Sequence, residues 1–256
     1  MRRLTRRRKS RTGSRKQRGG AQTRLTVGGV EFQGADVFMI NNYKRVDTVV
    51  LFQSRNRMGP YLQLAGGRCE DTHGSLEQTI SDELYEESRK SIRISEDVFK
   101  EMTRAGSYVD YDGDTKGLPG KRRCFVCAVP FISTTIYNEN KQIFDLLISP
   151  GNPAAVGKPA GHFKELLHKY LETDAMVRIP FKDLTDSVKA GNDGRARDIK
   201  GHHIATYVMK AIVEARKKGC RPFDLRTVKH AETLNNNKYK DSTRDLTGRI
   251  DLYTLH

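Results

Sequence analysis

A strand pattern, a glycine turn and a helix pattern follow one another directly in the first third of the chain. Residues 61–64 alternate in the manner of a half-buried strand and run into a Gly-Gly pair. From Ser75 to about residue 90 apolar side chains recur at helical spacing, as at Ile80 and Leu84, and Ser75 is placed to cap the helix. Because such a strand and helix bury their apolar faces against each other, this order predicts an α/β fold.

Three glutamates share one face of the predicted helix. Glu83, Glu86 and Glu87 are three and four residues apart, so their side chains are neighbours. Like charges at this spacing destabilise a helix, and a hard divalent cation reverses the effect by accepting carboxylate oxygens. The alternative is a solvated acidic face, but the upstream glycine pair lets backbone approach an ion closely. The pattern therefore favours a divalent-metal site.

The residues from Ala65 to Glu87 together resemble the Nudix box. Ala65-Gly66-Gly67-Arg68-Cys69-Glu70 is similar to the start of that motif, and Glu83-Leu84-Tyr85-Glu86-Glu87 to its centre. Residues 176–184 are similar to the strand and turn that close the fold, so the resemblance covers roughly residues 35–218. It implies a Nudix-like α/β/α sandwich with a mixed sheet. It also implies a pyrophosphohydrolase whose Mg²⁺ or Mn²⁺ ions are bound by the Gly67 carbonyl, Glu83, Glu86 and Glu87.

The box differs from the family pattern at three positions. Gly74 stands where the first glutamate is expected, Asp82 replaces an arginine, and Arg89 replaces the closing glycine. The loss of the arginine leaves four acids in six residues without an internal counter-charge. A catalytically weak or inactive Nudix-fold protein that binds nucleic acid is therefore the alternative to an enzyme.

Other residues are expected to complete the altered box. Glu70 or Glu77 substitutes for the missing glutamate, and either the metal or a cation such as Arg68 or Arg89 neutralises the acids.

The resemblance also implies roles in the reaction. Glu83 helps position or deprotonate the attacking water, unless a loop carboxylate such as Glu172 or Asp174 is the base. Two arginines in the turn after an early strand are expected to clamp phosphate oxygens, with a solvated turn as the alternative. The expected substrate contacts are Arg55, Arg57, Gly66 and Gly67.

The remaining pattern predicts one catalytic domain with an insertion. Strands are expected at residues 37–40, 48–52, 61–64, 107–111, 123–131 and 175–181, and an amphipathic helix at 203–218. Residues 132–175 contain two helical stretches, around 138–147 and 162–172, which form a helical insertion. We therefore expect a Nudix-like domain over 23–220, followed by a basic extension at 221–256.

Positive charge is concentrated at the beginning of the chain. Residues 1–20 contain ten of the 46 Lys and Arg residues and no acid, in a chain of formal net charge +15. Such a segment cannot bury enough apolar surface to offset its ordering entropy, so residues 1–22 are expected to be a disordered basic arm. RNA or DNA, a nuclear-import receptor and an acidic membrane surface are its possible partners, and a solvated tail is the alternative.

Composition excludes several classes of protein. There is no run of about 18 apolar residues and no apolar middle region of a secretory signal, so we expect no membrane insertion. Four scattered cysteines do not make a disulfide framework, and Cys124 and Cys127 lie in an apolar run that predicts a buried strand rather than a zinc site. An intracellular protein is expected, cytoplasmic or nuclear, with a virion as a further location.

The predicted metal-binding helix does not indicate which nucleoside-diphosphate-linked substrate the protein cleaves. Capped RNA, dinucleoside polyphosphates, nucleotide sugars or ADP-ribose, oxidised nucleoside triphosphates and inositol pyrophosphates all contain the linkage. The basic arm and the insertion favour capped RNA, because a free nucleotide needs neither.

Overall fold

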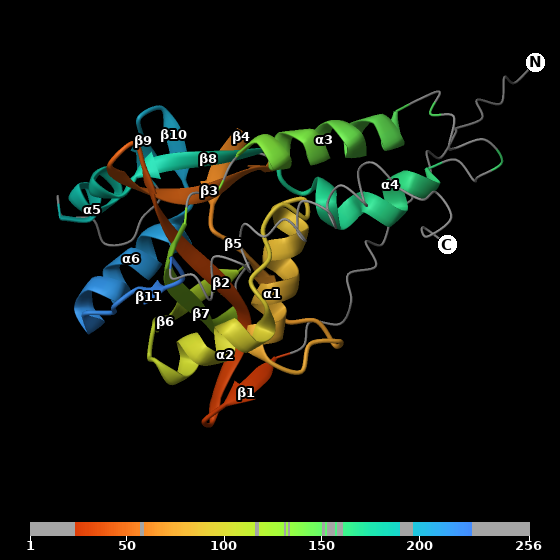
Figure 1. Ribbon diagram of the computed structural model, residues 1–256. Coiled ribbons are helices and arrows are strands. Elements are labelled where there is room, and N and C mark those ends of the chain that lie inside the picture. The colour runs from red at the N-terminus through yellow and green to blue at the C-terminus, as the bar shows by residue number, and fades with distance from the viewer. Residues whose placement is uncertain are drawn as a thin grey trace, which may run out of the picture.

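The computed structural model describes residues 24–56, 59–115, 118–130, 132, 134–149, 152, 157, 161–189 and 197–226. The predicted arm, Arg57 and most of the predicted C-terminal extension lie outside these residues. The strands are β1 (Leu25–Val27), β2 (Val30–Tyr43), β3 (Val46–Asn56), β4 (Gly59–Gln63), β5 (Ala65–Arg68), β6 (Tyr108–Thr115), β7 (Leu118–Val129), β8 (Ala175–Pro180), β9 (Arg197–Ile199), β10 (His202–Ile204) and β11 (Phe223–Asp224). The helices are α1 (Leu76–Glu87), α2 (Glu96–Arg104), α3 (Thr134–Ile148), α4 (His162–Leu167), the 3₁₀ helix η2 (His168–Leu171), α5 (Phe181–Lys189) and α6 (Thr206–Lys218) (Figure 1).

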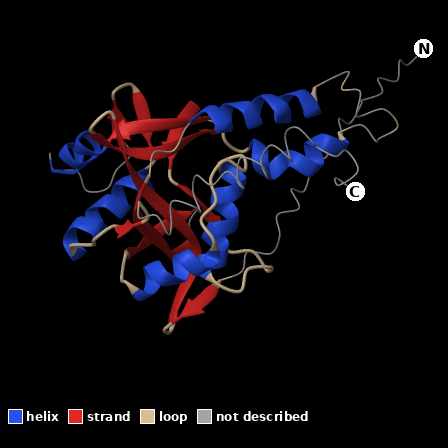
Figure 2. Cartoon of the chain, in the orientation of Figure 1, coloured by secondary structure: helices blue, strands red, loops and turns tan. Residues whose placement is uncertain are grey.

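One mixed sheet joins the described strands. Its main path runs β11-β7-β2-β3-β4-β10-β9, while β1 and β5 pair with β2, β6 pairs with β7, and β8 pairs with β3. The long strand β2 is parallel to β7 and antiparallel to β3 and β5. Strand β5 is thereby held against the part of β2 that also pairs with β7, and the helices surround this sheet (Figure 2).

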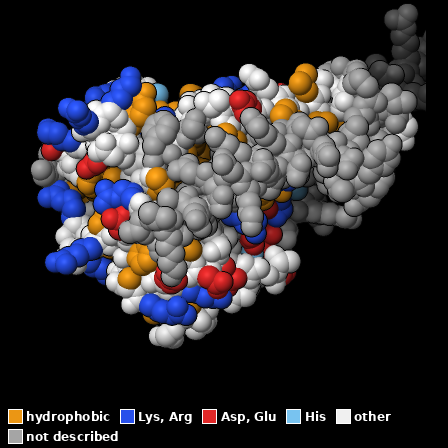
Figure 3. All heavy atoms as spheres, viewed as in Figure 1, with side chains coloured by type: hydrophobic (Ala, Val, Ile, Leu, Met, Phe, Trp, Pro, Cys, Tyr) orange, Lys and Arg blue, Asp and Glu red, His pale blue; other side chains and the backbone are white. Residues whose placement is uncertain are grey.

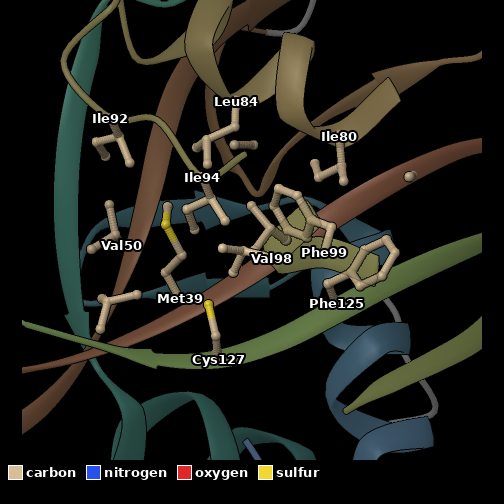
Figure 4. Packing of buried hydrophobic residues seen from close by; sticks show 14 of the residues in the cluster. Met39, Val50, Ile80, Leu84, Ile92, Ile94, Val98, Phe99, Phe125 and Cys127 are labelled. Carbon is tan, nitrogen blue, oxygen red and sulfur yellow. The ribbon is translucent and has the colours of Figure 1, made fainter. Parts of the chain in front are cut away.

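Alternate residues of β2 serve two apolar cores. Val37 and Met39 face one core, where Ile80 of α1 and Phe99 of α2 also lie (Figure 4). Phe38 faces the other core, which contains residues of α5 and α6. A strand with helices on both sides must be apolar on both faces, and this gives β2 its nearly continuous buried run. The expected α/β/α sandwich with a mixed sheet is confirmed.

The carboxylate helix forms where the spacing predicts it. The Ser75 side chain accepts a hydrogen bond from the Gln78 backbone N–H, and Ile80 and Leu84 are fully buried. The helix ends at Glu87 rather than near residue 90. Arg89 and Lys90 adopt φ values of 53° and 62°, and two left-handed residues in succession cannot continue a right-handed helix.

Residues 134–148 and 162–171 form the two predicted helical stretches. Helices α3 and α4 with η2 share a small apolar cluster of their own around Phe144, Phe163 and Leu167. Tyr137, by contrast, is buried in the core that contains Ile80 and Leu84. The insertion is thus attached to the domain through the first turns of α3.

Several elements differ from the prediction. Helix α2 was not predicted, the turn expected at 182–184 is part of helix α5, and β9 and β10 form an unpredicted hairpin. Beyond residue 220, β11 pairs in parallel with β7 and Leu225 is buried, so the chain remains part of the domain there. Strands β9, β10 and β11 are only two or three residues long, so their local patterns are weak.

The cysteines are free in the structure. Cys124 and Cys127 lie on β7 with their side chains buried in different cores, as expected of a strand that is covered on both sides. Among the helices that the structure describes, none is long and apolar enough to cross a membrane.

Candidate functional site

The glycine pair on β5 lies against the glutamate helix. A Cβ atom at Gly67 would overlap the Glu83 carboxylate, and one at Gly66 would overlap the backbone of β2 at Ala35 and Asp36. The Gly66 N–H donates to Glu87 Oε2 at 2.8 Å. Gly67 is therefore required for the close approach of β5 to α1, and Gly66 for the close approach of β5 to β2.

Glu87 is buried and forms a hydrogen bond with the glycine loop. Its side chain is buried, with Oε2 accepting from Gly66 and Oε1 accepting from Gln63 Nε2 at 2.8 Å. Burial raises the pKa of this carboxyl well above its usual value, and the charge on Glu83 raises it further. Because both oxygens have partners, Glu87 connects α1 to the glycine loop.

Glu83 is the glutamate of the three whose pKa is raised to near neutral pH. Burial raises its pKa to about 8, with further contributions from the carboxylates of Glu86 and Glu172. A carboxyl with this pKa exchanges its proton near neutral pH. Glu83 is therefore suited to holding or releasing a proton beside Gly67.

A lysine from the insertion neutralises part of the acidic cluster. Lys169 Nζ is 3.1 Å from Glu86 Oε1 and 3.7 Å from Glu70 Oε2. The expectation that Arg89 would provide this charge is wrong, since its guanidinium donates to the Thr173 carbonyl. Lys169 was not predicted, because η2 comes to the glutamates only through the packing of the insertion.

Three acids in and around the box, Glu70, Glu77 and Asp82, have different surroundings. Glu70 lies at the acidic cluster, whereas Glu77 accepts a hydrogen bond from Thr103 at 2.5 Å, on the side of α1 that packs against α2. The side chain of Asp82 is half exposed and lies 3.7 Å from His73 Nε2. Of the two candidate substitutes for the missing glutamate, the structure therefore places Glu70 at the site.

A buried ion pair lies beneath the glycine loop. Arg122 on β7 donates from Nε and Nη2 to both carboxylate oxygens of Asp36, at 2.8 and 2.6 Å. The Tyr111 hydroxyl donates to the same carboxylate at 2.5 Å. Arg122 Nη2 also donates to the Gly67 carbonyl at 2.9 Å, so the oxygen predicted as a metal ligand already accepts a guanidinium N–H. The only sequence signal for this pair is an acid within an apolar strand.

A cavity of about 490 Å³ opens beside the loop. Its lining residues are Ser54, Arg55, Tyr61, Gln63, Gly66, Gly67, Arg68, Glu87, Gly113, Arg122, Glu172 and Tyr207. The structure therefore brings Arg55 and Glu172, which are distant in sequence, to the same cavity as the glycine pair. Arg57, the second predicted phosphate contact, lies outside the described residues.

The two candidate loop bases have different surroundings. Glu172 lines the cavity, and its pKa is raised by loss of hydration there and then by the Glu86 carboxylate. Asp174 Oδ2 lies 3.9 Å from Arg55 Nε. Glu172 is therefore the better placed of the two to accept a proton in the cavity.

The acidic cluster has the oxygen ligands that a hard divalent cation prefers, but its carboxylates do not lie close enough together in the structure to bind one. Carboxylates of Glu70, Glu83, Glu86 and Glu172 are close enough to perturb one another, as the raised pKa of Glu83 shows, and oxygen donors are what Mg²⁺ and Mn²⁺ prefer. Yet within the described part of the chain no three His, Cys, Asp or Glu side chains are grouped closely enough to hold a metal ion.

We expect the metal-free protein to lose stability as the pH rises from 5 to 8. The folded state retains the Glu83 proton up to its pKa of about 8, whereas the unfolded chain releases it near pH 4, so the unfolded state gains relative stability in between. Urea unfolding in EDTA at both pH values should show that Glu83→Gln removes on the order of 3 kcal/mol of this loss.

The exposed Glu139 on α3 provides the control for that measurement, because its glutamine variant should keep the wild-type pH dependence. An unchanged pH dependence in Glu83→Gln would contradict the assignment of this proton to Glu83.

The sequence matches no protein-family model and no curated protein. Solved structures are similar to it. The NUDIX domain of Shewanella oneidensis NrtR, complexed with ADP ribose, is 12% identical with a TM-score of 0.40, and the match covers 73% of this chain and 87% of that chain. The C. elegans Ap4A hydrolase binary complex is 11% identical with a TM-score of 0.38, covering 73% and 98%.

A third similar structure is a mutT/nudix family protein from Listeria innocua, 15% identical with a TM-score of 0.33, covering 73% of this chain and 94% of that chain. In the present chain, a mixed-sheet sandwich places the glycine loop of β5 against the glutamate helix, which is the arrangement expected from the resemblance of residues 65–87 to the Nudix box.

Proposed function

We propose that the protein is a Mg²⁺- or Mn²⁺-dependent pyrophosphohydrolase that cleaves a diphosphate linkage in a nucleoside-diphosphate-linked substrate. The observation that carries this proposal is the placement of Glu83 against Gly67, which lies in the wall of a cavity that Glu172 also lines. The raised pKa of Glu83 agrees with this crowding of carboxylates. A cluster of acids that repel one another beside a cavity lined by arginines is suited to a cation and a polyphosphate.

Glu83 and Glu86 would hold the metal ion, which leaves Glu172 free to act as the base. When bound, the ion polarises the phosphoryl oxygens and lowers the pKa of a bound water. Glu172 would accept the proton of the attacking water, whose oxygen forms a bond to phosphorus while the bridging P–O bond breaks and its electrons leave with the departing phosphate. Arg55 and Arg68 would bind the phosphate oxygens from the cavity wall.

Capped RNA is the substrate we favour among the candidates. Residues 1–20 would bind its backbone phosphates without reading sequence. The side of the molecule that bears α5 and α6 also carries many Lys and Arg side chains (Figure 3). They include Lys182, Lys210, Arg216, Lys217 and Lys218. A long polyanion can contact such a surface while its capped end occupies the cavity.

A Nudix-fold protein that binds nucleic acid without turnover is the second candidate. The observations that favour it are that Lys169 already neutralises Glu86, and that Arg122 already donates to the Gly67 carbonyl.

An assay of the full chain separates the two candidates. The protein is incubated with capped RNA, ADP-ribose or a dinucleoside polyphosphate, in Mg²⁺, in Mn²⁺ or in EDTA, and products are resolved by chromatography. We expect nucleotide products from at least one substrate with metal and none in EDTA. If no substrate is cleaved while capped RNA still binds, the hydrolase proposal is overturned in favour of the binding protein.

A further inference from the structure

Arg89 lies just after the glutamate helix, where both its buried side chain and its left-handed backbone are energetically unfavourable. Its side chain is only 2% exposed, and its backbone has a φ of 53°, a left-handed conformation that glycine adopts without strain. Burying a guanidinium is unfavourable unless its N–H groups are bonded. Glycine would end α1 here at lower cost, so the arginine side chain has to contribute through its contacts.

Those contacts join α1 to the insertion and to the loop after it. The guanidinium donates from Nε and Nη2 to the Thr173 carbonyl, and from Nε to the Tyr137 hydroxyl at 3.3 Å. The Tyr137 ring lies 5.6 Å from the guanidinium carbon. The Arg89 carbonyl in turn accepts from Asn140 Nδ2 at 2.6 Å.

Thr173 is hydrogen-bonded to both Arg89 and Tyr137, while Arg89 Nη1 is buried without a hydrogen-bond partner among the described residues. Thr173 is fully buried, and its hydroxyl donates to the Glu87 carbonyl at 2.7 Å, at the last residue of α1. The hydroxyl of Tyr137 lies 2.9 Å from the same Thr173 oxygen. Side chain and backbone of Thr173 are thus both held by the end of the glutamate helix. We name Arg89, Tyr137 and Thr173 the Thr173 clamp.

Thr173, which the clamp ties to the end of α1, lies between the two candidate bases Glu172 and Asp174. On either side of Thr173, the Glu172 carbonyl accepts from Ser54 Oγ at 2.9 Å, and the Asp174 N–H donates to the Gln53 carbonyl at 2.7 Å. The backbone at 172–174 is therefore held by β3 on one side and by α1 on the other. This sets the direction in which the Glu172 side chain enters the cavity.

We propose that Arg89 is a positioning residue, which acts through Thr173 to hold the Glu172 carboxylate in register with Glu83 and Glu86. The part of this proposal that concerns turnover rests on the proposed function. Misplacement of a reacting group by about 1 Å can cost on the order of 100-fold in rate, so a clamp of this kind affects catalysis without touching substrate.

The test uses Arg89→Gly, Thr173→Val and the double variant in the full chain. Glycine accepts the backbone conformation at position 89, and valine keeps the shape of threonine without its hydroxyl. Hydrogen–deuterium exchange should be about tenfold faster or more at residues 172–174 in each single variant, with α6 unchanged. The kcat should fall roughly 10- to 100-fold while KM changes less than about threefold.

The double variant gives the sharper result. If both side chains act through one clamp, the two substitutions together should be little worse than Arg89→Gly alone. The control is Thr173→Ser, which keeps the hydroxyl and should stay near wild type.

The proposal would be overturned if the losses of kcat in the two single variants added up in the double variant. It would also be overturned if hydrogen–deuterium exchange rose equally in α6, or stayed at the wild-type rate at residues 172–174. Faster exchange with unchanged kcat would also overturn it. A wild-type protein without turnover would refute the proposed function, and the exchange measurement would then decide on the clamp by itself.

Discussion

Replacing Glu86 by glutamine is expected to lower kcat for the diphosphate substrate by about 100-fold or more. Glutamine keeps the size and a carbonyl oxygen of glutamate but removes the charge that a divalent ion needs. The side chain is 20% exposed and pairs with the partly exposed Lys169, so the fold should be retained. The measurement is steady-state turnover in Mg²⁺ and Mn²⁺, with circular dichroism as the check on folding.

Glu139→Gln on α3 is the matched control, because the same chemical change on an exposed helix face should leave turnover within about twofold of wild type. Turnover by Glu86→Gln within about threefold of wild type would contradict a role for this carboxylate in metal binding.

Replacing Arg122 by methionine should lower the free energy of unfolding by about 3–5 kcal/mol. Asp36 is 1% exposed, and the substitution would leave its carboxylate buried, with the Tyr111 hydroxyl as the one remaining side-chain donor among the described residues. The Gly67 carbonyl would also lose the guanidinium. Urea unfolding at neutral pH measures the loss.

Two variants make that result specific. Arg226→Met breaks an exposed pair with Asp224 and should cost less than about 1 kcal/mol. Adding Asp36→Asn to Arg122→Met should recover part of the loss, because the unpaired charge is then removed. A cost for Arg122→Met as small as that for Arg226→Met would show that the buried pair contributes little to stability.

Local periodicity was sufficient for the elements with long or capped patterns. Helix α1 follows from the Ser75 cap and the spacing of Ile80 and Leu84, and β7 from its apolar run. Helix α2 carried a readable signal that was missed: Ser95 precedes two acids in the first turn, and Val98, Phe99 and Met102 share a face. The two-residue strand β11 has no such signal, since only its pairing with β7 makes it a strand.

The departures from the Nudix pattern became interpretable only in three dimensions. The sequence shows Arg89 where the family has glycine, and charge alone suggested a partner for the glutamates. The structure shows that the backbone at Arg89 is left-handed, a conformation that glycine adopts without strain, and that the guanidinium donates to the Thr173 carbonyl instead. A partner 84 residues away cannot be read from spacing along a helix.

By itself, the sequence determined that Glu83, Glu86 and Glu87 share one helix beside a glycine pair, because helix spacing and turn chemistry act over a few residues. Only the tertiary structure decided how the three differ. Glu87 is buried and accepts a hydrogen bond from the Gly66 N–H, and Glu83 lies against Gly67. Glu86 accepts a hydrogen bond from Lys169, which is 83 residues away along the chain. Those differences arise from which strand and which insertion helix pack around α1, and long-range packing leaves no periodic trace in the sequence.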